Sequence, residues 1–277
     1  MSTETISFTK QSNTSTASST TTKISTTKSK STIRILNVND TRKAAITLLD
    51  SFRTDSLAKL LVCHIPTQEE KDRCELALYE AYLRQHMSKG LCLGINESED
   101  RFETVAIWST PTSVERGLDS FGNLMQSGYD KVWNLFGDEG RDKIFYGMLP
   151  LLHDSCERIL TNDSRLRHKG VWTLVYLGST LQARGKGNAR TMFEYMFNNY
   201  IDVSDNNISY LESSSPDNIP IYERFGFKVY EDIVLGNPNV KNAVEGQDYA
   251  IMNVMIRGTK GHDWSKDANT FLTQGKL

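Results

Sequence analysis

The chain has 277 residues, of which 38% are hydrophobic and 24% are charged, and its formal net charge is −2. This composition is typical of a globular protein of one large or two small domains, and it excludes collagen-like and disulfide-scaffold classes. No run of about 18 apolar residues predicts a membrane span, and the near-neutral charge gives no footprint for nucleic acid. Because no cysteines form a C-x-x-C pair and the histidines lack zinc-ligand spacing, we expect no metal site and reduced thiols, as in the cytoplasm.

Residues 1–32 differ in composition from the rest of the chain. Twenty of them are Ser or Thr, and four lysines accompany a single acidic residue, Glu4. Such a segment buries too little apolar surface to fold, so we predict a disordered tail. It has no apolar core of a secretory signal and no Arg, which disfavours a mitochondrial transit peptide. A cytoplasmic location is therefore expected, with the nucleus as the alternative. Without the tail the chain has a net charge of −5.

The first half of the remaining chain alternates between strand and helix patterns. Asn39, Asp40 and Thr41 offer N-cap chemistry for a helix. Thr67 and Glu70 form a capping box that opens a second helix. The expected elements are a strand at 33–38, helices at 43–52 and 68–87, and strands at 91–95 and 103–109 joined by a polar turn.

Residues 113–168 have a helical spacing of apolar and aromatic side chains. Gly117, Gly122 and Gly128 argue against one unbroken helix, and Pro150 is expected to kink or break the second helical stretch. Two interpretations of the aromatic positions remain open. They pack in the core, or they form a roof over a substrate site.

After Gly170 the pattern changes to strands. The run 171–177 is β-rich and has little polarity, as expected of a central strand. A helix from Asn188 and a strand at 208–211 complete a βαβ unit, which we expect to be parallel and right-handed. A short helix at 219–225 and strands at 228–230 and 249–256 follow, and Trp264 is the candidate anchor of a polar extension at 259–277. The expected fold is a mixed α/β sheet in one domain at 33–258.

A glycine-containing loop lies between the central strand and the next helix. Gly185 and Gly187 would let backbone N–H groups approach an anion, and the start of the helix adds its positive dipole end. The simpler alternative is an ordinary connecting loop with exposed basic residues. The loop does not fit a P-loop, because Thr180 replaces the first glycine, or a Rossmann fingerprint, because Arg190 stands at its third position. It fits the pattern Q/R-x-x-G-x-G/A, with Gln182 as its first residue.

At these residues the chain resembles the GNAT superfamily of acetyl-CoA-dependent N-acetyltransferases. The segment from Asn218 to Phe227 is similar to the family's second signature, a short helix with a Tyr followed by Gly-Phe. Tyr222 lies 35 residues beyond Gly187, across a helix and a strand, as in the family. The element order matches the family from about 33 to 257, and the helical segment before the central strand is similar to that of fungal and bacterial small-molecule enzymes. One departure is Ser179, where the family often has Pro.

The resemblance implies a sheet that is splayed open by a bulge in the central strand. It implies that backbone groups of Leu177, Gly178 and Ser179 bind the pantetheine arm, and that a backbone N–H near Leu177 polarises the thioester carbonyl. The implied binding loop consists of Gln182, Ala183, Arg184, Gly185, Lys186, Gly187, Asn188 and Ala189, and the N–H groups from Arg184 to Ala189 would hold the pyrophosphate.

The resemblance also implies proton-transfer groups. Tyr222 matches the family's general acid, although it would also serve by packing against the cofactor. Asn218 would bond the pantetheine arm or act only as a turn residue. Glu212 is our first candidate for the general base and Glu103 the second, acting directly or through water, and each has the alternative of a solvated or ion-paired carboxylate.

Three further polar residues have simpler interpretations. His168 is expected to be a loop residue, and Cys92 and Cys156 are expected in the core, because direct transfer needs no acyl-enzyme.

We therefore predict an acetyl-CoA-dependent enzyme that acetylates a primary amine by direct attack. A small-molecule acceptor is favoured, and the mildly acidic domain suits a cationic amine such as a polyamine or an aminated drug. The alternatives are a protein or peptide acetyltransferase and a catalytically idle acyl-CoA-binding module. Nucleic-acid binding by the tail is disfavoured because aromatic and basic residues are not interleaved. A homodimer is compatible with the family.

Overall fold

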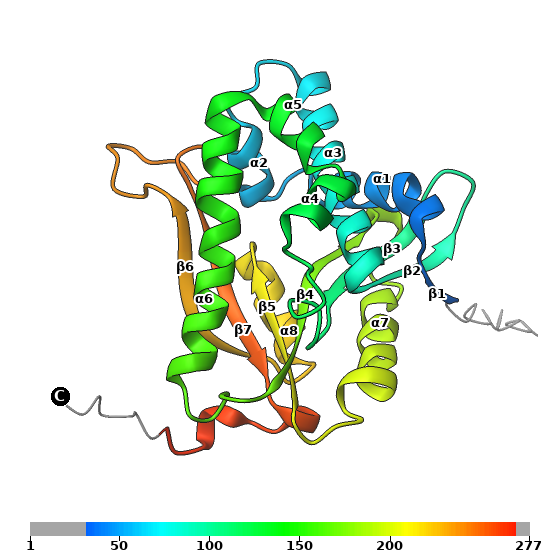
Figure 1. Ribbon diagram of the computed structural model, residues 1–277, viewed down its shortest axis with the longest axis vertical. Coiled ribbons are helices and arrows are strands. Elements are labelled where there is room, and N and C mark those ends of the chain that lie inside the picture. The colour runs from blue at the N-terminus through cyan, green and yellow to red at the C-terminus, as the bar shows by residue number, and fades with distance from the viewer. Residues whose placement is uncertain (1–31, 270–277) are drawn as a thin grey trace, which may run out of the picture. The chain divides into compact units, whose positions relative to one another are not determined.

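Seven strands form one sheet in a computed structural model that describes residues 32–269 (Figure 1). The order is β1-β2-β3-β4-β5-β7-β6, and the pairing of β4 with β5 is parallel while the other neighbours are antiparallel. The predicted mixed α/β fold is confirmed. The strands are β1 (Ile33–Ile35), β2 (Leu91–Glu97), β3 (Phe102–Ser109), β4 (Gly170–Ser179), β5 (Asn207–Ser213), β6 (Lys228–Gly236) and β7 (Tyr249–Arg257). The tail expected at 1–32 lies almost wholly outside the described residues, as does the end of the extension, 270–277.

Helices pack on both faces of the sheet and bury two apolar clusters. The larger cluster joins one face to α1, α2, α3, α5 and α6, and the smaller joins the other face to α7 and α8. In Figure 1, α6 crosses in front of the sheet, and α7 lies at its other side. The helices are α1 (Thr41–Phe52), α2 (Ser56–Val62), α3 (Gln68–Lys89), α4 (Phe121–Ser127), α5 (Tyr129–Arg141), α6 (Leu149–Asn162), α7 (Asn188–Met196) and α8 (Ile219–Glu223).

The helix starts follow from local capping chemistry. The predicted cap at Thr67 is confirmed, because its side chain accepts the N–H of Glu70 and donates to the Glu70 carboxylate at 2.8 Å. The helix α2 was not predicted. Asp55 caps it by accepting the N–H of Ala58 at 3.0 Å.

The predicted break at Pro150 is wrong. Pro150 lies in the first turn of α6, where its missing N–H is tolerated. The chain before it, Asp142–Met148, winds as a wider π-helix that leads directly into α6. The predicted interruption at Gly128 is confirmed, because this residue ends α4 with a φ of 98°.

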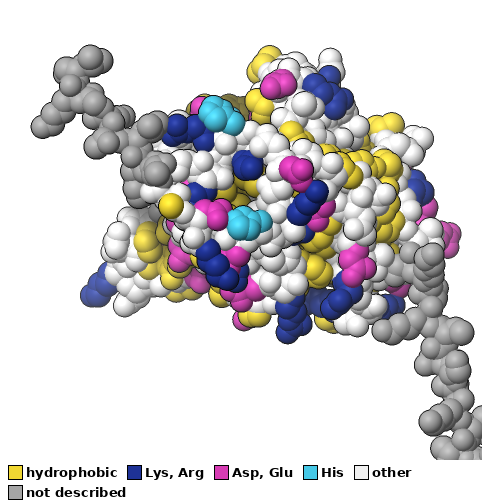
Figure 2. Space-filling view, turned by 90° about the horizontal axis from the view of Figure 1, so that it is seen from below, with side chains coloured by type: hydrophobic (Ala, Val, Ile, Leu, Met, Phe, Trp, Pro, Cys, Tyr) yellow, Lys and Arg dark blue, Asp and Glu magenta, His cyan; other side chains and the backbone are white. Residues whose placement is uncertain are grey.

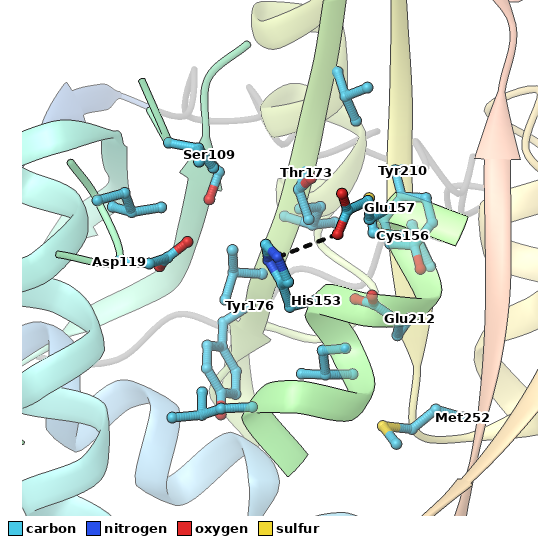
Figure 3. Close-up of a pocket in the computed structure, with 18 of the residues that line it drawn as sticks. Ser109, Asp119, His153, Cys156, Glu157, Thr173, Tyr176, Tyr210, Glu212 and Met252 are labelled. Atoms are coloured by element: carbon cyan, nitrogen blue, oxygen red, sulfur yellow. Dashed lines mark ion pairs between the residues drawn. The ribbon is translucent and has the colours of Figure 1, made fainter. Parts of the chain in front are cut away.

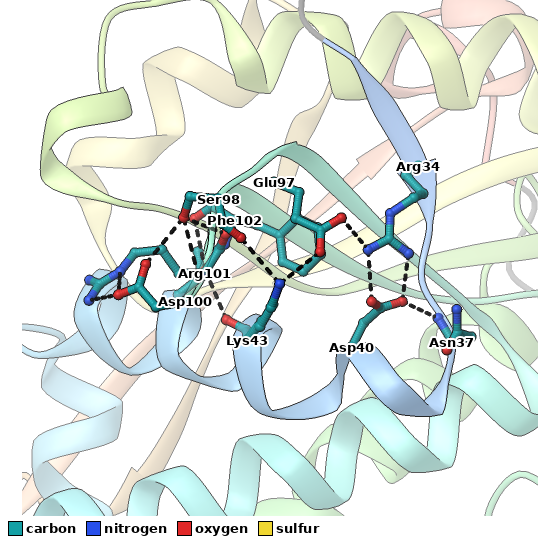
Figure 4. Close-up of polar contacts among 10 residues, drawn as sticks. Arg34, Asn37, Asp40, Lys43, Glu97, Ser98, Asp100, Arg101 and Phe102 are labelled. Carbon is teal, nitrogen blue, oxygen red and sulfur yellow. Dashed lines mark hydrogen bonds and ion pairs between the residues drawn. The ribbon is translucent and has the colours of Figure 1, made fainter.

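A polar network fixes β1 and the β2–β3 hairpin to the start of α1 (Figure 4). The Arg34 guanidinium pairs with both oxygens of Asp40 at 2.8 and 2.7 Å and with Glu97 at 2.7 Å. Lys43 pairs with the other oxygen of Glu97 at 2.9 Å. Because such partly exposed pairs each contribute at most about 1 kcal/mol, their main effect is to orient the edge strand and helix.

The sheet opens between β4 and β5. These strands pair from Gly170 and Asn207 only as far as Leu174 and Leu211. One extra β4 residue, Val175, shifts the register against β3, and β4 then continues along β3 to Ser179. The edge of β4 beyond Leu174 therefore has no strand beside it on the β5 side, and the predicted bulge and splay are confirmed.

The C-terminal extension is anchored as predicted at Trp264. Its side chain is buried, its Nε1 donates to the Ile256 carbonyl at 2.8 Å, and the Arg165 guanidinium lies 4.8 Å from its ring centre. This anchor fixes residues 259–269 against the sheet.

Candidate active site

A cavity of about 1450 Å³ opens where β4 and β5 separate. Both strands contribute to its lining, together with α3, α6 and the segments around Leu118 and Tyr129. The helical segment 113–168 has both of its predicted roles. Val132 and Phe136 are buried in the core, whereas Phe145 and Leu152 line the cavity.

The glycine loop follows β4 and leads directly into α7. Gly185 and Gly187 have φ values of 77° and 89°, which side-chain-bearing residues rarely adopt. A Cβ on either glycine would meet no atom within 4 Å, so the space beside them is open to a ligand. No side chain caps α7. The start of this helix thus has the character of an anion site, because the first N–H groups of a helix have no acceptor within it.

The remaining loop residues divide between solvent and the protein interior. Gln182, Arg184 and Lys186 are exposed, Ala183 and Asn188 are buried, and Ala189 is half-buried. None of the loop residues lines the cavity itself.

Glu103 braces this loop from β3. Its carboxylate accepts hydrogen bonds from Lys186 at 2.7 Å, Asn188 at 3.0 Å and Asn96 at 2.9 Å. The hydrogen bond from Lys186 is the largest of the interactions that lower the pKa of Glu103 to about 2. The carboxylate does not line the cavity and is a weak base. The geometry therefore gives Glu103 the role of holding the loop and leaves Glu212 as the better candidate base.

The end of β4 approaches the site through its backbone. Leu177 lines the cavity. Gly178 faces α1, where a Cβ would lie 2.9 Å from the Ser51 side chain, and Ser179 shares a 2.9 Å hydrogen bond with Thr104. The side chain of Ser179 is thus engaged with β3, and only backbone groups on the open edge of β4 are placed to meet a ligand.

Glu212 points into the cavity from β5 (Figure 3). Burial raises its pKa from 4.5 to about 7, and the neighbouring Tyr210 hydroxyl opposes this rise. None of the interactions that set the pKa comes from Lys, Arg or His. A carboxylate with this pKa can accept a proton near neutral pH.

Tyr222 reaches the cavity from α8, and Asn218 lines it one turn earlier. The Tyr222 ring packs edge-on against Phe193 and Phe227, with ring centres 6.1 and 6.0 Å away. Burial, with a smaller contribution from Asp55, raises the pKa of Tyr222 to about 12. The hydroxyl therefore stays protonated at neutral pH and is available as a donor.

Sequence reasoning missed Asp55 and Ser214. Ser214 lines the cavity and donates to Asp55 at 2.6 Å. Burial raises the pKa of Asp55, and the Ser214 hydroxyl partly offsets the rise. The signal available in the sequence was the Asp-Ser pair that opens α2, a pattern typical of a helix N-cap.

The other predicted polar residues have no chemical role in this geometry. His168 is exposed in the loop before β4. Cys92 is buried in the core, while Cys156 lines the cavity, where burial raises the pKa of its thiol to about 12. A thiol with that pKa is a poor nucleophile at neutral pH.

Comparison with known proteins identifies the family. No family model matches the chain. The uncharacterized N-acetyltransferase C550.08 of Schizosaccharomyces pombe is 30% identical to it over 210 residues, which are 76% of this chain and 79% of that protein. The chain belongs to the GNAT superfamily of N-acetyltransferases. This acetyltransferase therefore has the activity class that its two sequence motifs predicted.

Solved structures give weaker similarities. A histone acetyltransferase HPA2 and related acetyltransferase from Corynebacterium glutamicum has a TM-score of 0.49 and 17% identity, covering 83% of this acetyltransferase and 96% of that chain. The polyamine N-acetyltransferase of Drosophila melanogaster has a TM-score of 0.47 and 12% identity, covering 83% and 100%. Between residues 32 and 269, no helix of the acetyltransferase has the length and apolar character needed to cross a bilayer, and no three potential metal ligands cluster.

Proposed function

We propose that this acetyltransferase moves the acetyl group of acetyl-CoA directly to the primary amine of a small molecule. The observation that carries the proposal is the dual role of β4. Its residues from Val171 to Leu177 line the cavity, and its end leads into the glycine loop. One strand thus connects an anion site to a cavity that contains a base and an acid.

The residues present fit acetyl-CoA as a co-substrate. The open space at Gly185 and Gly187 and the start of α7 suit a pyrophosphate, and Arg184 and Lys186 add positive charge beside it. The open edge of β4 offers backbone groups for the pantetheine amides, and a backbone N–H near Leu177 would polarise the carbonyl. When bound, acetyl-CoA supplies the thioester whose carbonyl carbon the amine attacks.

Two side chains are placed to move the protons. Glu212 removes a proton from the incoming amine, because its raised pKa matches neutral pH. Tyr222 donates to the sulfur as negative charge develops there, and its raised pKa keeps the hydroxyl protonated until then. Asp55 and Ser214 hold the opposite wall beside Tyr222.

The test is thiol release from acetyl-CoA with a panel of polyamines, alkyl and aryl amines, aminoglycosides and lysine peptides. Release with small amines, and its loss in Gly187→Glu, supports the proposal. Release with peptides alone would assign a protein substrate. No release with any amine, in a protein that still binds acetyl-CoA, would favour the idle acyl-CoA-binding module.

A further inference from the structure

Aromatic rings form a continuous wall of the cavity. We call Phe52, Tyr82, Tyr129, Phe145 and Tyr176 the aromatic wall, and all five line the cavity. Tyr176 lies 5.1 Å from Tyr82 and 5.4 Å from Phe52, while Tyr129 lies 5.9 Å from Tyr82 and 6.2 Å from Phe145, all between ring centres. The Tyr129 hydroxyl is already used by the Gln85 side chain at 2.7 Å. This wall therefore offers mainly ring faces and edges to a ligand.

The interior of the cavity carries one carboxylate. Glu212 is shielded from solvent, whereas the other acidic lining residues, Asp119, Asp154 and Glu157, are exposed at the rim. In Figure 3, the Glu212 and Asp119 carboxylates enter from opposite sides. The interior histidine, His86, is buried, its pKa is lowered to about 4 by burial, and its Nε2 lies 3.1 Å from Ser109 Oγ. His86 is therefore neutral and does not balance Glu212.

The charges at the rim are mixed. Arg167, Lys169 and His168 border the cavity beside the acidic residues, and Arg167 is held by the Thr161 carbonyl at 2.7 Å. The face shown in Figure 2 likewise intersperses positive and negative side chains. The rim thus gives no strip of one sign that would guide a polycation.

The cavity is long as well as apolar. Side chains lining it extend along β4 from Val171 to Leu177, which corresponds to about 20 Å at roughly 3.3 Å per residue. Its volume of about 1450 Å³ exceeds the range of roughly 300–1000 Å³ common for small-ligand sites. Room for an extended acceptor therefore remains beside the pantetheine arm.

We propose that the acceptor is an amphipathic monoamine, with one ammonium group at Glu212 and an elongated apolar or aromatic body against the aromatic wall. This proposal rests on the proposed acetyltransferase function and narrows its substrate class. A second ammonium, sugar hydroxyls or peptide groups would lose water along this wall without gaining partners. An apolar body gains from the same burial.

The first experiment compares kcat/KM for butylamine, hexylamine and octylamine, whose amino groups are chemically alike. We expect a rise of about fourfold for each methylene that becomes buried, and on the order of a hundredfold from butylamine to octylamine. Octylamine with a second terminal amino group should fall well below octylamine. A flat series, or a diamine or polyamine used as well as octylamine, would overturn the proposal.

A variant locates the apolar body in the cavity. Thr173 lies on β4 within the cavity and apart from the proposed catalytic groups (Figure 3). Thr173→Trp should reduce the kcat/KM of octylamine to about that of butylamine and leave butylamine unchanged. Leu152→Phe provides a milder block from α6, and Val234→Trp, at an exposed β6 residue that does not line the cavity, is the matched control. Equal preference for octylamine in both cavity variants would contradict the placement.

Failure of this proposal is distinguishable from failure of the proposed function. Calorimetric binding of acetyl-CoA together with turnover of polar amines, but not of octylamine, would refute the amphipathic acceptor and keep the acetyltransferase. Absence of both acetyl-CoA binding and thiol release would refute both.

Discussion

Replacing Glu212 with Gln should remove activity and stabilise the protein at alkaline pH. The pKa of Glu212 is raised from 4.5 to about 7 in the folded protein, chiefly by burial. Ionisation of this side chain is therefore easier in the unfolded chain, and each step up in pH between these values favours unfolding. The penalty is absent well below pH 4.5 and complete above pH 7. Gln carries no ionisable group, so Glu212→Gln avoids it.

The size of the effect follows from the two pKa values. The difference between 4.5 and about 7 is equivalent to about 3 kcal/mol. Most of it, about 2.5 kcal/mol, develops between pH 5 and pH 8.5. The free energy of unfolding of Glu212→Gln, measured relative to the native sequence, should rise by that amount over this interval. Any pH-independent effect of the new amide cancels in the comparison.

The assay is urea denaturation of both proteins at pH 5 and at pH 8.5, paired with thiol release and acetyl-CoA binding. Glu99→Gln changes an exposed carboxylate in the β2–β3 turn and should give the same difference at both values of pH. Acetyl-CoA affinity should be kept in Glu212→Gln while kcat falls at least a hundredfold. Stability curves that stay parallel within about 0.5 kcal/mol would refute the buried, unbalanced carboxylate on which both the base and the acceptor proposals depend.

Three further substitutions test the rest of the site. Gly187→Glu should weaken acetyl-CoA binding at least a hundredfold by calorimetry, since it strains a residue with φ of 89° and adds negative charge at the anion site, and unchanged affinity would reject the loop assignment. Tyr222→Phe should lower kcat by on the order of a hundredfold with acetyl-CoA affinity nearly constant, whereas an unaltered kcat would exclude Tyr222 as the acid. Ser214→Ala removes the 2.6 Å donor to buried Asp55 and should cost about 1–3 kcal/mol in urea denaturation at pH 8, and equal stability would show that Asp55 does not depend on it.

The features that sequence reasoning predicted well are local ones. The glycine loop and the Tyr222 helix each lie within about ten residues, and their chemistry depends on backbone conformations and caps that neighbouring residues determine. The central strand and its parallel partner were predictable for the same reason. The splay of the sheet became predictable only through the family resemblance, because the extra residue at Val175 has no signature of its own.

The features that were missed or misjudged depend on contacts between distant residues. Ser214 and Asp55 are 159 positions apart, and Lys186 and Glu103 are 83 apart. Before the fold is known, Glu103 and Glu212 are equivalent carboxylates at the ends of strands. Three donors surround the first, and apolar burial without a cation surrounds the second. Pro150 was misjudged because a π-helical turn, which has no sequence signal, carries the chain into α6.

This division between local and distant determinants also separates the two halves of the site. The anion site is built from one short loop and one helix start, so a sequence pattern is sufficient to find it. The acceptor side is built from α3, α6, β4 and β5 together, and its selectivity comes from which side chains those elements bring to one cavity. A relative that keeps the glycine loop but replaces the aromatic wall would keep its co-substrate and change its amine. Exchange of Tyr82 or Phe145 for a polar residue should therefore alter the ranking of amines in kcat/KM while leaving acetyl-CoA affinity in place.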